Sequence, residues 1–223
     1  MTNFDRIKGY YSVFDEQNRL ARDNSGKLGF EMTMHILKKY LPEKGTVLDL
    51  GGGAGVYAFE LAQKGYQVWL ADLSERLIEQ ASERRSVEQT ENLIATDVVN
   101  AIDLSNYQDN MFDIVLALGP FYHLTEEIER QKCASEIKRV LKDGGIVIAG
   151  FIPYLSGSIA IVDRYFFRPE HVDASNLAYV FETGKFHNLA HTGFQEGYYA
   201  TATEMKKLFE SNHFETNCNL LDK

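Results

Sequence analysis

The chain has 223 residues, a formal net charge of −9 at pH 7 and hydrophobic residues at 44% of its positions. This length suits one α/β domain with a large core and is short for two ordinary domains. The acidic balance argues against nucleic acid as a partner, because affinity for phosphates needs lysine and arginine. There is no signal-peptide pattern and no apolar run close to the ~20 residues of a membrane helix, so we expect a cytoplasmic protein. We expect it to be either a monomer or a homodimer.

Helical and strand patterns alternate through the middle of the chain. An apolar stripe over 28–41 predicts a first helix, which Pro42 ends. The elements expected after it are strand 47–51, helix 56–64, strand 67–71, helix 75–84, strand 92–96, strand 112–118, helix 127–141 and strand 145–151. Strands that alternate with helices pair in parallel through right-handed crossovers. The sequence therefore predicts a Rossmann-like, doubly wound α/β fold, with a mostly parallel sheet and helices on both faces.

The pattern divides one domain, 1–223, into four parts. They are an N-terminal helical arm over 1–45, a cofactor-binding core over 46–150, an insertion over 151–201 and a C-terminal helix and strand over 202–223. The insertion is rich in aromatic residues and leaves the fifth strand at the edge of the sheet where ligands bind. We therefore expect it to cap a substrate pocket, and a plain packing lobe is the alternative.

The end of the chain predicts one more helix and one more strand. The helix is expected over 203–211 and the strand near 214–221.

The most informative segment is a glycine-rich turn after the first predicted strand. Asp49 precedes the glycines of this turn, and a second acid, Asp72, ends the next predicted strand. Glycine lets the backbone turn sharply and lets a ligand lie against it. The segment 53–58 also fits a dinucleotide fingerprint, with Asp72 as the acid for the ribose. Asp49 favours S-adenosylmethionine instead, because a carboxylate repels a pyrophosphate and attracts a sulfonium and an ammonium group.

The turn Asp49-x-Gly51-x-Gly53-x-Gly55 resembles the first motif of the class I S-adenosylmethionine-dependent methyltransferases. The resemblance continues in chain order to residue 148. Its further segments are Asp72 at the end of the second strand, Thr96-Asp97-Val98 at the end of the third, 112–117 as the fourth strand, and 141–148 as the turn into the fifth, with Asp143 where the family has proline. One such match would be weak, but five in order are a specific signal.

This resemblance implies a methyltransferase that uses S-adenosylmethionine and leaves S-adenosylhomocysteine. The family's sheet normally ends in a hairpin with an antiparallel last strand, and the residues after 221 are too few to form it, so we expect a chain that is shortened at its C-terminus or that lacks the final strand. It implies that Asp72 binds both ribose hydroxyls and that Asp97 accepts a hydrogen bond from the adenine N6 amino group. Helix capping by Asp72 and a solvated loop position for Asp97 are the alternatives. The cofactor-binding residues expected on this basis are Asp49, Gly51, Gly52, Gly53, Gly55, Asp72, Leu73, Asp97, Val98, Leu118, Gly119 and Tyr11.

The candidate catalytic residue is His123, in the loop after the fourth predicted strand. Methyl transfer mainly requires alignment and exclusion of water, and a general base helps only when the nucleophile arrives protonated. An imidazole titrates near neutrality and can serve as that base; packing or lining of the cofactor pocket is the alternative role. His187 and His191 stand four residues apart, but no acid-rich helical pattern surrounds them, so we expect no metal site.

The methyl acceptor is left open by the sequence. The Asn-Pro-Pro-Tyr type of motif is missing, and neither Cys133 nor Cys218 lies in the Pro-Cys context of RNA cytosine methyltransferases. Together with the acidic charge, this favours a small molecule that is methylated on N, O or S. The alternatives are an RNA or protein methyltransferase, a noncatalytic S-adenosylmethionine-binding or scaffold protein, and an NAD-dependent oxidoreductase.

Overall fold

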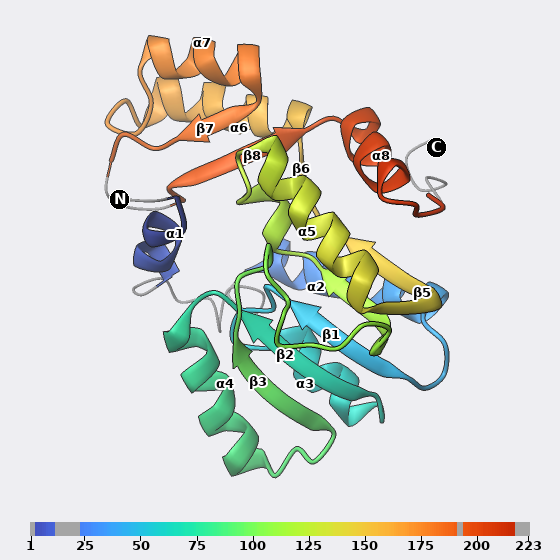
Figure 1. Cartoon of the computed structure of the whole chain (residues 1–223). Coiled ribbons are helices and arrows are strands. Elements are labelled where there is room, and N and C mark those ends of the chain that lie inside the picture. The colour runs from blue at the N-terminus through green and yellow to red at the C-terminus, as the bar shows by residue number, and fades with distance from the viewer. Residues whose placement is uncertain (1–2, 12–22, 191–193, 217–223) are drawn as a thin grey trace.

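The computed structural model describes residues 3–11, 23–190 and 194–216. At its centre lies a five-stranded sheet in the order β3-β2-β1-β4-β5 (Figure 1). Its strands are β1 (Thr46–Leu50), β2 (Gln67–Asp72), β3 (Leu93–Val98), β4 (Phe112–Ala117) and β5 (Leu141–Ala149). Every neighbouring pair is parallel, so all five carboxyl ends lie at one edge. The predicted doubly wound α/β fold is confirmed, and its order reverses between β1 and β4, where ligands bind in such sheets.

Alternate side chains of the strands build a core on each face of the sheet. In β4, Ile114 and Leu116 belong to one core, whereas Val115 and Ala117 belong to the other, as the two-residue period of a strand requires. The first core is covered by α2 (Asn24–Tyr40), α3 (Val56–Gln63) and α4 (Glu75–Glu88), and the second by α5 (Glu127–Val140) and α8 (Ala202–Ser211). The sheet is thus enclosed between two helical layers.

Several element boundaries differ from the prediction, each for a local reason. Helix α2 begins four residues early because Asp23 caps it, accepting a hydrogen bond from the Gly26 amide at 2.8 Å. Strand β5 begins at Leu141, which was assigned to the preceding helix. Leu141 pairs with Phe112, and the residues after it bulge before the regular pairing resumes at Ile146.

The insertion forms a small lobe with its own sheet. Its elements are β6 (Ile152–Pro153), α6 (Tyr154–Phe167), α7 (Ala174–Thr183), β7 (Lys185–His187) and β8 (Glu196–Ala200), and the sheet order is β6-β8-β7. Strand β8 runs parallel to β6 and antiparallel to β7. Phe186 and Tyr199 stack in the core of this lobe, with ring centroids 6.2 Å apart. Many of its aromatic residues therefore pack together, and its role as a substrate cap remains a prediction.

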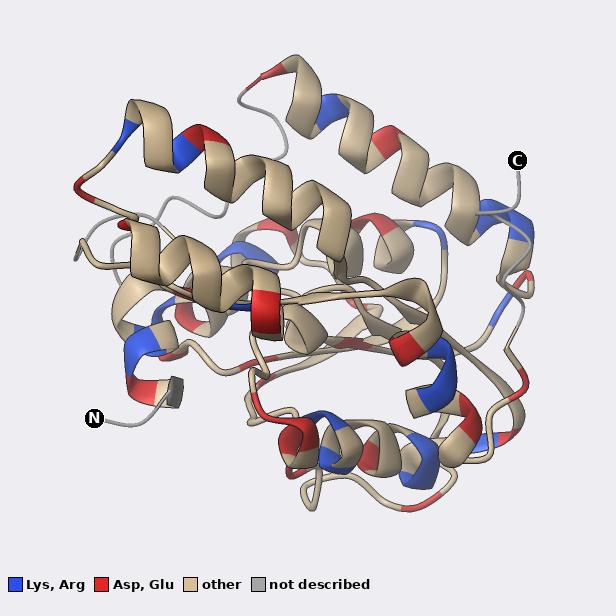
Figure 2. Cartoon of the chain, turned by 90° about the horizontal axis from the view of Figure 1, so that it is seen from above, with Lys and Arg blue, Asp and Glu red and all other residues tan. Residues whose placement is uncertain are grey.

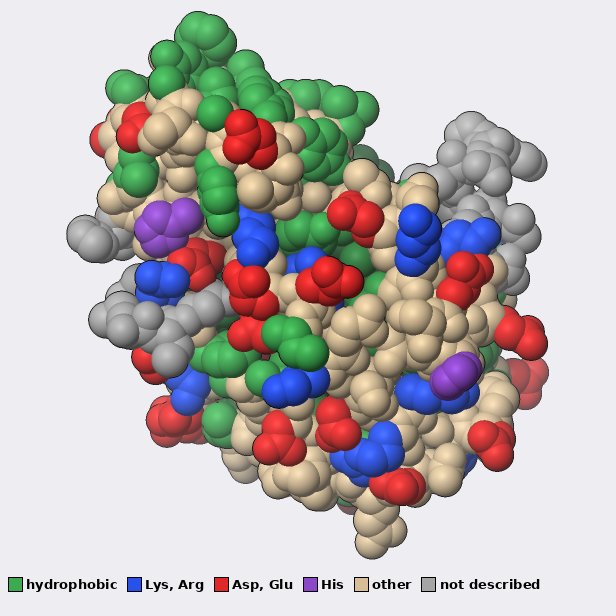
Figure 3. Space-filling view, turned by 45° about the horizontal axis from the view of Figure 1, so that its top comes forward, with side chains coloured by type: hydrophobic (Ala, Val, Ile, Leu, Met, Phe, Trp, Pro, Cys, Tyr) green, Lys and Arg blue, Asp and Glu red, His purple; other side chains and the backbone are tan. Residues whose placement is uncertain are grey.

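The surface carries both signs of charge and one conspicuous apolar region. Blue basic residues and red acidic residues are interspersed along helices that are otherwise tan (Figure 2). Exposed apolar side chains gather on the lobe of α6 and α7 (Figure 3). In the described part of the chain, no helix is both long and apolar enough to cross a membrane. Of the strand expected near 214–221, residues 214–216 are in no strand, and the others lie outside the described residues.

Candidate functional site

The turn between β1 and α3 brings a carboxylate against bare backbone. Gly51, Gly53 and Gly55 have φ values of 68°, 60° and 84°, in the left-handed region that glycine occupies without strain. At Gly52 a Cβ atom would lie 2.5 Å from Oδ2 of Asp49. Glycine is therefore needed at this position because the Asp49 side chain lies directly against the loop.

Asp49 is a buried acid with only 1% of its surface exposed. Its Oδ2 atom is buried and has no hydrogen-bond partner among the described residues. The pKa of Asp49 is raised to about 7, mainly by burial and then by the nearby charge of Asp72, while a hydrogen bond with the Ala58 backbone opposes both effects. A carboxylate in this position is stabilised by a cation that donates hydrogen bonds.

Asp72, at the end of β2, is held by two backbone amides. Its Oδ2 accepts a hydrogen bond from Gly53 and its Oδ1 accepts one from Ser74, both at 2.8 Å. A carboxylate can accept several hydrogen bonds at once. The N-cap of α4 is Ser74, and no side chain caps it, so Asp72 lies two residues before the cap and does not take the capping position that was the alternative to ribose binding.

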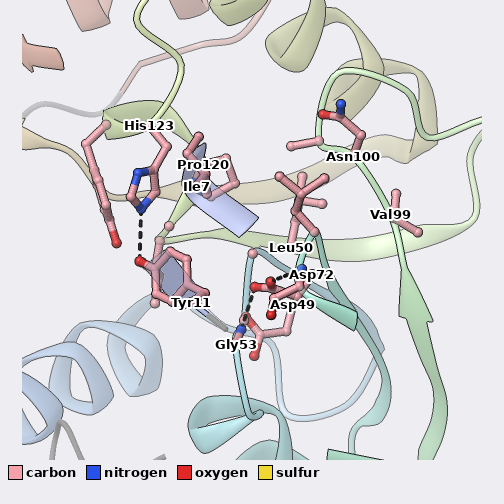
Figure 4. A pocket seen from close by; sticks show the side chains of 18 of the residues that line it. Ile7, Tyr11, Asp49, Leu50, Gly53, Asp72, Val99, Asn100, Pro120 and His123 are labelled. Carbon is pink, nitrogen blue, oxygen red and sulfur yellow. Dashed lines mark hydrogen bonds between the residues drawn. The ribbon is translucent and has the colours of Figure 1, made fainter. Parts of the chain in front are cut away.

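Both acids line a cavity of about 1000 Å³ at the carboxyl edge of the sheet (Figure 4). This volume includes the open mouth of the cavity. The predicted site residues that line it are Tyr11, Asp49, Gly51, Gly52, Gly53, Asp72, Leu73, Leu118, Gly119 and His123. The fold thus assembles most of the predicted site from residues that lie far apart in the sequence.

Three predicted cofactor-binding residues do not line the cavity: Gly55, Asp97 and Val98. Gly55 lies at the start of α3, where a Cβ would meet Leu70 at 2.9 Å, so its role is the tight turn and packing. The Asp97 carboxylate accepts a hydrogen bond from the Tyr107 hydroxyl at 2.9 Å, and Val98 is exposed. Gly55 therefore has a structural role in the turn, whereas contact of Asp97 and Val98 with the cofactor stays a prediction.

The loop after β3 supplies residues that the sequence reasoning missed. Val99, Asn100 and Ala101 line the cavity. Asn100 is three residues past the acid that was singled out, and its Oδ1 accepts a hydrogen bond from the Ile102 amide at 3.2 Å. The sequence pattern pointed to an acid at the end of the third strand. The side chain that lines the cavity is instead an amide three residues later.

Helix α1 (Asn3–Tyr11) forms another wall of the cavity. Its residues Phe4, Ile7, Lys8 and Tyr11 line the space. Arg76, in the first turn of α4, fixes the end of α1 by donating two hydrogen bonds to the Tyr11 carbonyl oxygen, from Nε at 3.0 Å and from Nη2 at 2.8 Å. The N-terminal arm therefore belongs to the site, although it is far from the glycine turn in the sequence.

His123 and Tyr11 meet across the cavity wall. The Tyr11 hydroxyl and His123 Nε2 are 2.9 Å apart (Figure 4). The pKa of His123 is lowered to about 4, mainly by burial, and the nearby Glu196 backbone opposes this shift. The imidazole is therefore neutral at pH 7. Phe194 packs against it, with ring centroids 5.3 Å apart.

The histidine pair that the sequence suggested as a weak metal motif is only partly described. His187 Nδ1 lies 3.0 Å from Glu196 Oε1, and the same carboxylate oxygen pairs with Arg6 of α1. His191 lies outside the described residues. Within the described ranges, no group of three or more potential metal ligands comes together.

The known proteins that resemble this chain are methyltransferases. A family model described as "Methyltransferase domain" matches residues 48–149. The glycine/sarcosine N-methyltransferase of Parasynechococcus marenigrum (strain WH8102) is 30% identical over 168 residues, which cover 69% of this chain and 59% of that protein. The ubiquinone/menaquinone biosynthesis C-methyltransferase UbiE of Zymomonas mobilis is 37% identical over 100 residues, which cover 44% of this chain and 39% of that protein.

A solved structure extends the likeness beyond the core. The PH0226 protein of Pyrococcus horikoshii OT3 aligns with a TM-score of 0.70 and 25% sequence identity, over 91% of this chain and 88% of that one. The chain spans about half the length of the curated relatives it matches. The relatives share a fold and a methyltransferase core, and their printed names differ in the acceptor.

Proposed function

Because the chain belongs to the class I S-adenosylmethionine-dependent methyltransferases, we propose that it transfers a methyl group from S-adenosylmethionine to a small molecule. Two relatives support a small acceptor, since one is named for glycine and sarcosine and the other for ubiquinone and menaquinone biosynthesis. The acidic net charge of −9 supports it too, because the phosphates of RNA attract a basic surface.

The observation that carries the proposal is the buried, unpartnered Oδ2 of Asp49 beside the glycine turn. A diphosphate in this place would meet two carboxylates, Asp49 and Asp72, and would be repelled. A ligand with an ammonium group supplies the missing hydrogen bond and the compensating charge. The residues therefore fit S-adenosylmethionine and disfavour a dinucleotide.

The other walls suit the remaining parts of the same ligand. Asp72 lines the cavity, where its carboxylate would accept hydrogen bonds from the ribose hydroxyls. Asn100 offers an amide to the edge of the adenine, and Leu73, Val99 and Ala101 offer apolar contacts to its faces. When bound, S-adenosylmethionine supplies an activated methyl group on a sulfonium, and the chain's task is to orient the acceptor and exclude water.

Calorimetry with S-adenosylhomocysteine and NAD in parallel tests the cofactor. We expect S-adenosylhomocysteine to bind and NAD to give no heat of binding, and binding of NAD alone would overturn the assignment. Asp72→Asn should weaken S-adenosylhomocysteine by roughly 10-fold or more, because it removes a charged acceptor. The matched control is Asp97→Asn, which lies outside the cavity and should change the affinity by less than about twofold.

The acceptor is tested with a methyl donor labelled in the transferred group. Incubation with fractionated pools of small metabolites should place the label in one fraction, and tRNA and protein in the same assay should remain unlabelled. Labelling of tRNA alone would contradict the small-molecule proposal and would leave the cofactor assignment intact.

A further inference from the structure

We propose that Phe194 of the lobe is a positioning residue for methyl transfer, because its ring holds Tyr122 and His123 in the cavity wall that the acceptor meets. This inference rests on the proposed function and gives the lobe a part in it. Tyr122 and His123 line the cavity, whereas Phe194 does not. Phe194 therefore acts through the two side chains that it contacts.

An aromatic ring of the lobe packs against the loop that carries these two residues. The loop is the short 3-10 helix η1 (Pro120–Tyr122), and His123 follows it directly. The ring centroid of Phe194 lies 5.3 Å from that of His123 and 6.3 Å from that of Tyr122. Aromatic rings attract one another at centroid separations of about 4.5–7 Å. The lobe therefore contacts the site through both lining residues.

Phe194 is held in place through its ring and through its backbone. The ring stacks on Phe186, with centroids 6.1 Å apart and planes 4° from parallel, and Phe186 is buried in the core of the lobe. Asn188, which is only 4% exposed, donates a hydrogen bond from Nδ2 to the carbonyl oxygen of Phe194 at 2.9 Å. The packing of the lobe therefore sets the position of the ring.

Strand β8 leaves room for this ring at a glycine. At Gly197 a Cβ atom would lie 2.6 Å from the Phe194 ring and 3.3 Å from the carbonyl oxygen of Tyr122. A larger residue would therefore push apart the ring and the loop that it supports. The missing side chain at Gly197 lets the lobe and η1 approach closely.

The wall that Phe194 supports is the one available to the acceptor. His123 lies on a different side of the cavity from Asp49 and Asp72 (Figure 4). If these carboxylates hold the cofactor, the space beside His123 is left for the acceptor. A displacement of about 1 Å in such a wall can lower the rate of transfer by as much as about 100-fold.

Histidine NMR of the ligand-free protein tests the contact without any acceptor. Burial lowers the pKa of His123 from 6.5 to about 4. Phe194→Ala should admit water to the imidazole and raise this pKa by about one unit or more. Phe194→Leu keeps an apolar side chain of similar size and should stay closer to the parent.

The matched control is Leu177→Ala. Leu177 packs against the same lobe core and does not line the cavity, so its loss weakens the lobe without removing the contact with His123. The titration of His123 should follow the parent in this variant. An unchanged pKa in Phe194→Ala, or an equal rise in Leu177→Ala, would overturn the proposal.

Kinetics then separates positioning from stability, with the metabolite fraction that accepts label in the screen as the acceptor. Phe194→Ala should lower kcat/KM for this fraction by about 10- to 100-fold, while the calorimetric affinity for S-adenosylhomocysteine stays within about threefold. Phe194→Leu should recover most of the activity, and Leu177→Ala should keep the parental kcat/KM.

Two kinetic results would contradict the inference. One is an unchanged kcat/KM in Phe194→Ala, and the other is a loss of affinity for S-adenosylhomocysteine as large as the loss of kcat/KM. Labelling of tRNA in place of small metabolites would instead remove the proposed function alone, because the NMR comparison needs no acceptor.

Discussion

A single buried carboxylate links the glycine motif to the chemistry of the cavity. Asp49 needs glycine at 52 because its Oδ2 occupies the place of a Cβ atom. The same close approach excludes water from the carboxylate and raises its pKa. One physical cause, the close packing of the Asp49 carboxylate against the loop, therefore explains two observations. It explains why an acid precedes glycine at this spacing in the sequence, and it explains why the pKa of Asp49 is raised.

We predict that Asp49→Asn stabilises the ligand-free protein above neutral pH. The folded state holds the Asp49 proton up to a pKa of about 7, whereas the unfolded chain releases it near 3.8. Between these values the folded state binds more protons, so the free energy of unfolding falls as the pH rises. About three pKa units correspond to roughly 4 kcal/mol at most, or about 10 °C in Tm for a chain of this size.

Thermal unfolding at pH 5 and pH 8 checks this. The Tm advantage of Asp49→Asn should be larger at pH 8, whereas Asp143→Asn, at an exposed position near the start of β5, should follow the parent at both pH values. The same Asp49→Asn protein should bind S-adenosylmethionine at least about 10-fold more weakly. An equal Tm difference at the two pH values would mean that Asp49 titrates normally.

At the scale of single residues, the sequence was a good guide to strand ends and a poor guide to loops. Asp49 and Asp72 directly follow buried apolar runs, so their place at the carboxyl edge was predictable. Asp97 also ends an apolar run, but its carboxylate accepts a hydrogen bond from the Tyr107 hydroxyl and does not line the cavity. Asn100 reaches the cavity through the path of an irregular loop, which no periodic pattern encodes.

Among the elements, α1 shows why local patterns fail. A helix of nine residues is marginal in water, and its sequence gives only scattered aromatic residues. The contacts that stabilise it come from distant parts of the chain: Arg76 binds its last residue, and Arg6 pairs with Glu196 of β8. The helix is therefore defined by tertiary structure, which the sequence pattern does not reveal.

We predict that Arg76→Gln loosens α1 and weakens ligand binding. The substitution removes two hydrogen bonds to the Tyr11 carbonyl oxygen, each worth about 1 kcal/mol or more, so the affinity for S-adenosylhomocysteine should fall about 5- to 30-fold. Hydrogen exchange in 3–11 should accelerate.

The matched control is Arg85→Gln, on the same helix but outside the cavity lining. It should leave both the affinity and the exchange of 3–11 unchanged. If Arg76→Gln kept full affinity while α1 exchanged faster, the helix would cover the cavity without contributing to binding.

At the scale of the whole molecule, the described residues pack around two centres, the parallel sheet and the lobe, and Tyr198 and Ala200 of β8 join the lobe to one core of the sheet. The parallel sheet has a core on each face, and the lobe of 152–200 has a third core around Phe186, Ile161 and Val180. The alternating strands of the first centre were predictable. The second sheet was not, because its strands are short and two of them pair across a long stretch of chain.

We predict that Phe186→Ala destabilises the lobe more than the parallel sheet. Removing a fully buried ring costs about 3–5 kcal/mol, and Phe186 is 1% exposed. Hydrogen exchange should accelerate in α6, α7 and β7, while β1 and β4 retain their protection. Phe181→Ala, at a ring that is 45% exposed, is the control and should change little. Equal acceleration in β1 would show that both centres unfold as one unit.

The helix that begins at Asn3 carries a practical consequence for anyone who handles this protein. Because its side chains form part of the cavity wall, a deletion of residues 3–11 would open the cavity to solvent. The truncated protein would keep a folded parallel sheet and would bind small molecules more weakly.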